Sequence, residues 1–191
     1  MVELISKIKA SMDLSPMAEE FLLKIGRNRK VSKGTTLIHQ GQKVEKVYFV
    51  NDGCLRSFVV DNNGKEHTLQ FAIKSWWMSD YIGIHNNEPA HLNVECLSEA
   101  NLIEFNAKEL DSVLYRFPEF EPFQRKQLER HVVALELRIL DQLRLSASER
   151  YEGFLQKYGD IEQSVANFHI ASYLGITQES LSRIRLKKLK K

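Results

Sequence analysis

The chain of 191 residues contains only two cysteines, Cys54 and Cys96, and neither has a second cysteine close to it in the sequence. A disulfide framework, a zinc ribbon and a cysteine-held iron–sulfur cluster all need more thiols than this. No apolar run approaches the ~18 residues that a membrane-spanning helix requires. The N-terminus lacks the apolar core of a signal peptide. We therefore expect a cytoplasmic protein, without a membrane segment, whose thiols are buried and reduced.

Signatures of catalysis are also missing. The sequence has no glycine-rich phosphate loop, nucleophile motif or paired-carboxylate motif. His85 and His91 lie near Asp80 and Glu88 in the sequence, so these four residues form a candidate metal-binding set. No pair among them has the His-x-His spacing of a β-roll metalloenzyme, and loop histidines are the commoner explanation. We expect no catalytic residues, no metal and no cofactor.

Positive charge is concentrated at the C-terminal end. Residues 178–191 contain one acidic residue, Glu179, and have Lys or Arg at positions 183, 185, 187, 188, 190 and 191. The whole chain has a formal net charge of only +2. A local excess of this sign is typical of a protein with a polyanionic partner, and a solvated basic tail is the alternative.

The region from Val31 to about Phe105 has the pattern of short strands. Apolar runs at 35–38, 47–50, 55–60 and 67–73 are separated by glycines or by Asn and Asp clusters about every ten residues. This spacing predicts an antiparallel, jelly-roll-like β-roll. The Asp-Asn-Asn-Gly run at 61–64 is the strongest hairpin signal. Before this region, Ser15 and Pro16 predict the start of a helix that ends near Gly26.

A long helix is predicted after Pro118. Four apolar residues at alternating spacings of four and three form a candidate dimer seam: Leu128, Val132, Leu135 and Ile139. A second apolar row, at 133, 137 and 140, is suited to packing on the helix's own domain. Ser146 and Glu149 then form a capping box that begins another helix. The predicted fold class is α+β: a β-roll sensor domain with an N-terminal helix (1–117), a dimerisation helix (118–145) and an all-α domain (146–191).

Residues 165–186 fill the key positions of a helix-turn-helix. Ala171 is a small contact residue, Gly175 suits the turn, and Thr177 can cap the second helix. The shared core is expected to contain Ile170, Leu174, Ile176, Leu181 and Ile184. The alternative is an ordinary helical hairpin in a packed core, but the polar second helix would be a poor face to bury.

Two parts of the chain resemble the Crp/Fnr family of regulators. Residues 170–177 with 179–183 resemble the family's DNA-binding signature, and residues 33–42 with 47–53 are similar to its cyclic-nucleotide-binding β-roll. The resemblance covers nearly the whole chain and preserves the order of sensor, long helix and DNA-binding domain. It implies a homodimer in which a small-molecule effector in the roll reorients the DNA-binding domains. The implied partners are double-stranded DNA and, for an activator, RNA polymerase.

The second helix of the motif is expected to place its N-terminal end in the major groove. Glu179 can accept a hydrogen bond from cytosine N4, and Arg183 can donate two to guanine. Arg185, Lys187 and Lys188 are expected to contact phosphates. Many members of the family carry arginine where this chain has Gln178, so its half-site should differ from theirs. The predicted DNA-binding residues are Thr177, Gln178, Glu179, Ser182, Arg183, Arg185, Lys187 and Lys188.

The effector loop departs from the family pattern. Members that bind a cyclic nucleotide hold its ribose with a Gly-Glu pair, and this pair aligns here with Ser79 and Asp80. They hold its phosphate with an Arg-Ser/Thr-Ala run, and this run aligns with residues 90–92. The arginine is missing, so we expect that cyclic AMP is not the effector. Either Trp76 or Trp77 is suited to filling the core, and Trp77 is included in the predicted pocket: Trp77, Ser79, Asp80, Ala90, His91 and Leu92.

Two other functions stay open. One is a ligand-binding regulatory subunit that acts on a protein partner and has a vestigial helix-turn-helix. The family's β-hairpin wing has no counterpart before Lys191, which fits this interpretation unless the basic tail replaces the wing; the six basic residues after Glu179 do not fit it. The other is a β-roll metalloenzyme, which the ligand spacing disfavours. The sequence favours a sequence-specific DNA-binding regulator.

Overall fold

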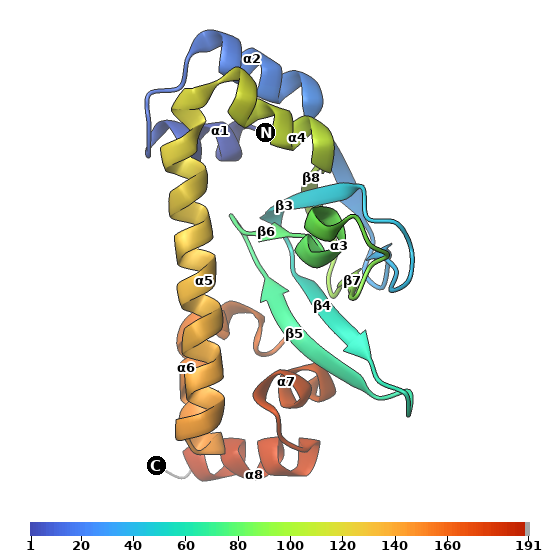
Figure 1. The fold of residues 1–191 in the computed structure, drawn as a ribbon. Coiled ribbons are helices and arrows are strands. Elements are labelled where there is room, and N and C mark those ends of the chain that lie inside the picture. Colours follow the sequence, from blue (N-terminus) through green and yellow to red (C-terminus); the bar gives the residue numbers. More distant parts are fainter. Residues whose placement is uncertain (190–191) are drawn as a thin grey trace. The chain divides into compact units, whose positions relative to one another are not determined.

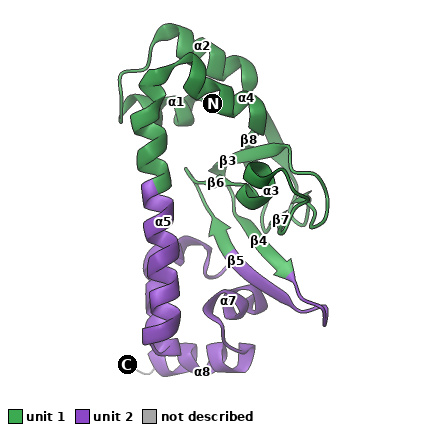
Figure 2. Ribbon diagram, in the orientation of Figure 1, with its two compact units in different colours: residues 1–59, 70–128 green, residues 60–69, 129–191 purple. Residues whose placement is uncertain are grey.

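The computed structural model describes residues 1–189 and divides into two compact units (Figures 1 and 2). The first contains residues 1–59 and 70–128, and the second contains residues 60–69 and the chain from 129 onward. Lys190 and Lys191, at the end of the predicted basic tail, lie outside the described residues. The domain boundaries predicted from the sequence lie at the ends of helices. The boundary between the two compact units instead falls inside the long helix, and the hairpin around residues 60–69 is divided between the units.

The first unit begins with two short helices, α1 (Val2–Lys9) and α2 (Pro16–Ile25). The Ser15 hydroxyl caps α2 by accepting from the Ala18 amide, as predicted. Eight strands and two further helices, α3 (Tyr81–Asn86) and α4 (Ala107–Arg116), follow. The strands are β1 (Arg27–Val31), β2 (Thr36–Ile38), β3 (Lys46–Asp52), β4 (Leu55–Val60), β5 (Glu66–Ala72), β6 (Trp77–Met78), β7 (Asn93–Cys96) and β8 (Ala100–Asn106).

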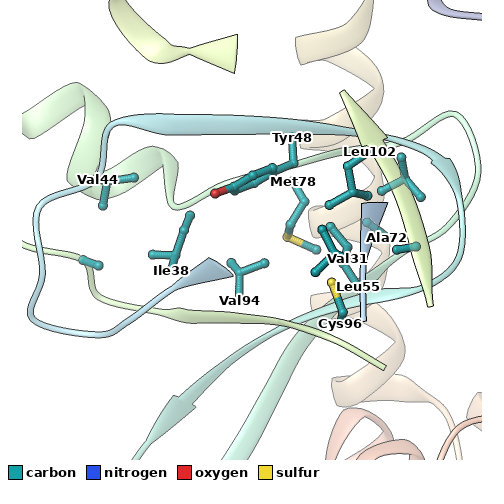
Figure 3. Packing of buried hydrophobic residues seen from close by; sticks show 13 residues of the cluster. Val31, Ile38, Val44, Tyr48, Leu55, Ala72, Met78, Val94, Cys96 and Leu102 are labelled. Atoms are coloured by element: carbon teal, nitrogen blue, oxygen red, sulfur yellow. The ribbon is translucent and has the colours of Figure 1, made fainter. Parts of the chain in front are cut away.

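The strands form two four-stranded sheets, in the orders β1-β8-β3-β6 and β2-β7-β4-β5. Apolar side chains from both sheets fill the space between them, and Figure 3 shows Tyr48, Met78 and Val94 in this cluster. Cys96 lies in the same cluster, and burial raises the pKa of its thiol to about 11. The antiparallel β-roll is confirmed.

Helices cover the opposite face of the first sheet. Phe49, Ile103 and Phe105 point to that face and pack against apolar residues of α1, α2 and α4, such as Leu4 and Leu22. The sequence did not predict α1, α3 or α4, because these helices are short or interrupted by polar residues. The sheet therefore has an apolar cluster on each side.

Helix α5 (Glu121–Arg144) is the long helix predicted from the sequence, and 24 residues give it a length of about 36 Å. A single 3₁₀ turn, η1 (Pro118–Phe120), precedes it. Pro122 lies in the first turn of α5, where the missing amide leaves no helical hydrogen bond unmade. The helix continues through the boundary between the two units.

The second unit contains three further helices, α6 (Ala147–Tyr158), α7 (Asn167–Leu174) and α8 (Gln178–Leu189), with a 3₁₀ turn η2 (Gly159–Ile161). The predicted capping box is present at the start of α6: Ser146 and Glu149 exchange hydrogen bonds with each other's backbone amides. The tip of the β4–β5 hairpin, residues 60–69, belongs to this unit as well (Figure 2). Its turn is the predicted one, with the Asp61 carboxylate accepting from the amides of Asn63 and Lys65.

Candidate nucleic-acid interface and effector loop

The turn between α7 and α8 has the geometry that the sequence predicts. Gly175 adopts a left-handed conformation, with φ 67° and ψ 36°, which a residue with a side chain rarely adopts. The amides of Gly175 and Ile176 donate to carbonyls in the last turn of α7. The Thr177 hydroxyl accepts from the Ser180 amide at 3.2 Å and caps α8.

The two helices share an apolar core. Ile170, Ala171, Leu174 and Leu181 are all buried, with at most 2% of each residue exposed. Ile176 and Ile184, which were predicted in the same core, are half-buried. This shared core fixes how α8 packs against α7.

Most of the predicted DNA-binding side chains lie exposed on α8. Thr177, which caps the helix, is exposed, and so are Gln178, Glu179, Ser182, Arg183, Lys187 and Lys188. Two hydrogen bonds lower the pKa of the Glu179 carboxyl group. The larger effect comes from the backbone amide of Glu179 itself, and the smaller from the Thr177 side chain. At neutral pH its carboxylate is therefore charged and can only accept hydrogen bonds. Arg183 donates to the Ser180 hydroxyl at 3.2 Å.

Arg185 lies differently from the other basic residues of α8. Its guanidinium donates to the Tyr151 hydroxyl at 3.2 Å and to Asn167 Oδ1 at 2.5 Å, and it forms an ion pair of 2.6 Å with Glu162. Tyr151 also donates to Glu162 at 2.7 Å. Burial is the main cause that raises the pKa of the Tyr151 phenol, and the hydrogen bond to Glu162 raises it further. Arg185 thus joins α8 to α6, to the segment after η2 and to α7, a role that its place in a basic run did not indicate.

The predicted seam residues are accessible on α5. Leu128, Val132 and Ile139 are exposed, and Leu135 is half-buried. The second apolar row, which the pattern suggested for packing on the helix's own domain, is exposed too, at Val133, Leu137 and Leu140. The helix therefore offers more apolar surface to a partner than the seam alone.

Asp80 is the central residue of the effector loop. Its side chain is fully buried and caps α3, where Oδ1 accepts from the Gly83 amide at 3.1 Å. Oδ2 accepts from the amides of His91 and Leu92 at 2.5 and 2.9 Å. Adjacent backbone amides of this kind form anion-binding sites. In this chain, a carboxylate of the protein itself already occupies the pair.

The other predicted residues of the effector loop lie around Asp80. The Ser79 hydroxyl donates to the Lys46 carbonyl at 2.6 Å. Ala90, at the position of the missing arginine, is buried in the interior cluster of the roll. His91 is exposed. Its Nε2 atom lies 3.0 Å from Oε2 of Glu88. Leu92 is half-buried.

Trp77 does not belong to the roll interior, which corrects its assignment to the effector pocket. It is paired with Phe49 in the sheet, and its ring contacts Phe49 and Phe105, with centroids 5.1 and 5.6 Å away, on the face covered by helices. Trp76 packs against the interior cluster instead. The two residues of β6 point to opposite faces of the sheet, and Met78 lies in the interior cluster. The pairing of β6 with β3 therefore places Trp77 on the face covered by helices.

Within residues 1–189, no group of three or more His, Cys, Asp or Glu side chains is placed to hold a metal ion. In the same part of the chain, no helix is both long and apolar enough to cross a membrane.

Comparison with known proteins agrees with this architecture. The cyclic nucleotide-binding domain family matches residues 28–117. The transcriptional activator protein Anr of Pseudomonas protegens is 26% identical over 178 residues, covering 84% of this chain and 69% of Anr. FixK2 from Bradyrhizobium japonicum has a similar structure, with a TM-score of 0.75 and 18% identity, covering 87% of this chain and 85% of FixK2. CLP of Xanthomonas campestris, described as a c-di-GMP responsive global regulator, has a TM-score of 0.68 and 15% identity over 92% of each chain.

Proposed function

Because the chain belongs to the Crp/Fnr family of transcription regulators, we propose that it binds specific double-stranded DNA as a homodimer through α7 and α8. The observation that carries this proposal is the exposed polar and basic face of α8, on a helix whose opposite side is anchored by Leu181. A buried structural hairpin would not expose this combination of residues. The helix is also presented by a left-handed glycine turn and a threonine cap, the arrangement of a helix-turn-helix.

The residues of α8 have different roles in DNA binding. Glu179 and Arg183, near the N-terminal end, read base edges, because a carboxylate accepts from cytosine N4 and a guanidinium donates in a fork to guanine. Thr177, Gln178 and Ser182 lie beside them and contact the same groove. Lys187 and Lys188 contact phosphates, which hold the helix in register without reading sequence. Arg185 fixes the helix within its domain.

The two copies of the chain associate along α5. Leu128, Val132, Leu135 and Ile139 supply a seam with coiled-coil spacing, and the exposure of three of them in the single chain leaves this surface available. Covering such side chains is favourable at about 25 cal/mol per Å² of apolar surface. A two-fold dimer presents two copies of α8 to two half-sites of opposite orientation.

The effector is not cyclic AMP. A buried cyclic phosphate needs a cation, and the position of that cation is held by Ala90 inside an apolar cluster. Asp80 supplies a negative charge at the amides of His91 and Leu92, where it competes with a phosphate and repels it. CLP, whose fold is similar, is described as responsive to c-di-GMP. A roll of this fold that binds a molecule other than cyclic AMP is consistent with that description.

Selection of duplexes from a random pool by the purified protein tests this function. The expected product is a family of two-fold symmetric sites, with half-sites about 34–36 Å apart along the helix axis. Failure to enrich any duplex, or enrichment of single asymmetric sites, would contradict the proposed dimeric reader. Arg183→Ala serves as the matched control in the same selection, because it should relax the preference at one base pair of each half-site.

A further inference from the structure

Arg150, in the first turns of α6, joins the end of α5 to the end of α7. Its guanidinium donates from Nη1 to the Leu145 carbonyl at 2.7 Å and from Nε to the Leu174 carbonyl at 3.1 Å. Leu145 directly follows α5, and Leu174 is the last residue of α7. The carbonyls of a helix's last turn have no partner within the helix and carry partial negative charge. One cation therefore stabilises two helix ends at once.

A glutamine of α5 contacts the same end of α7. Gln142 Nε2 donates to the Tyr173 carbonyl at 3.4 Å. A Cβ atom at Gly175, which has none, would lie 3.0 Å from Gln142 Oε1, so this side chain lies directly against the turn between α7 and α8. All of these residues belong to the second unit. Two side chains, Arg150 and Gln142, thus connect the end of α5 to consecutive carbonyls at the turn of the helix-turn-helix.

The direction of α8 relative to α5 depends on this junction. Helix α8 has 12 residues and is therefore about 18 Å long. A rotation of about 10° at the junction moves its far end by roughly 3 Å, and one base pair of duplex DNA is about 3.4 Å long. In a two-fold dimer, the distance between the two copies of α8 depends on how each is held against its own α5. A small rotation consequently changes the accepted spacing by about one base pair.

We propose that Arg150 and Gln142 fix the half-site spacing that the dimer accepts on DNA. Glu179 and Arg183 read the bases within each half-site, whereas these two positioning residues determine how far apart the half-sites lie. Neither side chain needs to contact DNA, because both donate to carbonyls of the protein itself. The inference rests on the proposed function, which supplies the dimer and its DNA.

A set of duplexes that differ only in spacing tests this role with the full chain. Each duplex contains two copies of the half-site that the wild-type protein selects, and the spacer between them changes by one base pair at a time. The wild-type protein should bind one spacing best and lose about tenfold in affinity when the spacer is one base pair longer or shorter. Arg150→Met removes the donors and keeps a long side chain. It should bind the best duplex about tenfold more weakly and prefer its spacing only about threefold or less.

Arg144→Met is the matched control. Arg144 is exposed at the last position of α5, and among residues 1–189 it forms no hydrogen bond or ion pair. This variant should keep the wild-type spacing preference. A loss of stability alone reduces the amount of folded protein and lowers binding to every duplex by the same factor, so it does not change the ratio between spacings. The ratio therefore separates positioning of α8 from a merely structural role.

Gln142→Ala is an independent variant and should weaken the spacing preference about twofold to threefold, because it removes a single uncharged hydrogen bond. An unchanged preference in Arg150→Met, or in Gln142→Ala if Arg150→Met does not fold, would refute the positioning role. A preference that is weakened equally in Arg144→Met would also overturn it. A wild-type protein that selects no duplex, or paired half-sites at no preferred spacing, would contradict the proposed dimeric reader itself. That outcome is therefore distinguishable from a failure of the positioning role alone.

Discussion

Replacing Arg185 with alanine separates two roles that a basic residue of α8 can have. The basic run in the sequence suggests that Arg185 contacts a phosphate. In the structure, the Arg185 guanidinium instead contacts Tyr151, Asn167 and Glu162. A phosphate contact contributes to DNA binding through charge. A positioning residue contributes by keeping α8 in place, whatever the salt concentration. The two roles therefore differ in both stability and salt dependence.

The magnitude follows from the burial of the ion pair. The side chains of Arg185 and Glu162 are 25% and 16% exposed. Breaking a fully buried pair costs about 3–5 kcal/mol, and an exposed pair contributes about 0.2–1 kcal/mol. A partly exposed pair with two further hydrogen bonds lies between these limits, at about 2 kcal/mol. For a chain of this size the melting temperature should fall by roughly 5 °C.

DNA affinity measured over a range of salt concentrations distinguishes the roles. Arg185→Ala should weaken binding to all duplexes and leave the slope of log K against log salt unchanged. Lys187→Ala is the control: it should leave the melting temperature unchanged and reduce the slope by about 0.9, the value for one neutralised phosphate. If Arg185→Ala instead reduces the slope by about one and unfolds at the wild-type temperature, Arg185 binds DNA directly and the positioning role is wrong.

Three further predictions follow from the proposed function. Leu135→Glu buries an unpaired charge in the α5 seam and should split the dimer or unfold the chain; sedimentation checks this, and a wild-type protein that is monomeric at micromolar concentration contradicts it. Arg183→Ala should cost about 1–3 kcal/mol at the best site and relax one base pair, whereas Lys187→Ala should weaken all sequences alike; the reverse result in binding assays would exchange their roles. Isothermal titration with cyclic AMP should give no saturable binding, and a dissociation constant in the micromolar range or tighter would overturn the assignment of residues 90–92.

The predictions that depended on neighbouring residues in the chain were the reliable ones. The Ser146–Glu149 capping box, the turn at 61–64 and the left-handed Gly175 each need residues only a few positions apart. Their physical cause, an unpaired amide or a strained backbone angle, is already present in the short segment. The β-roll and the long helix were predictable for a related reason, since their apolar periodicity is repeated over many residues.

The sequence alone determined that this chain has a β-roll, a long helix and a helix-turn-helix with a polar, basic second helix. Tertiary structure decided what individual polar side chains do. Asp80 occupies the amides of His91 and Leu92, Arg185 holds α8 in its domain, and Ser172 binds the edge of β5 more than a hundred residues earlier in the chain. A hydrogen bond depends on distance and direction, and these are set only when strand register and helix packing bring distant segments together. The same physical reason explains Trp77, whose face depends on the pairing of a two-residue strand.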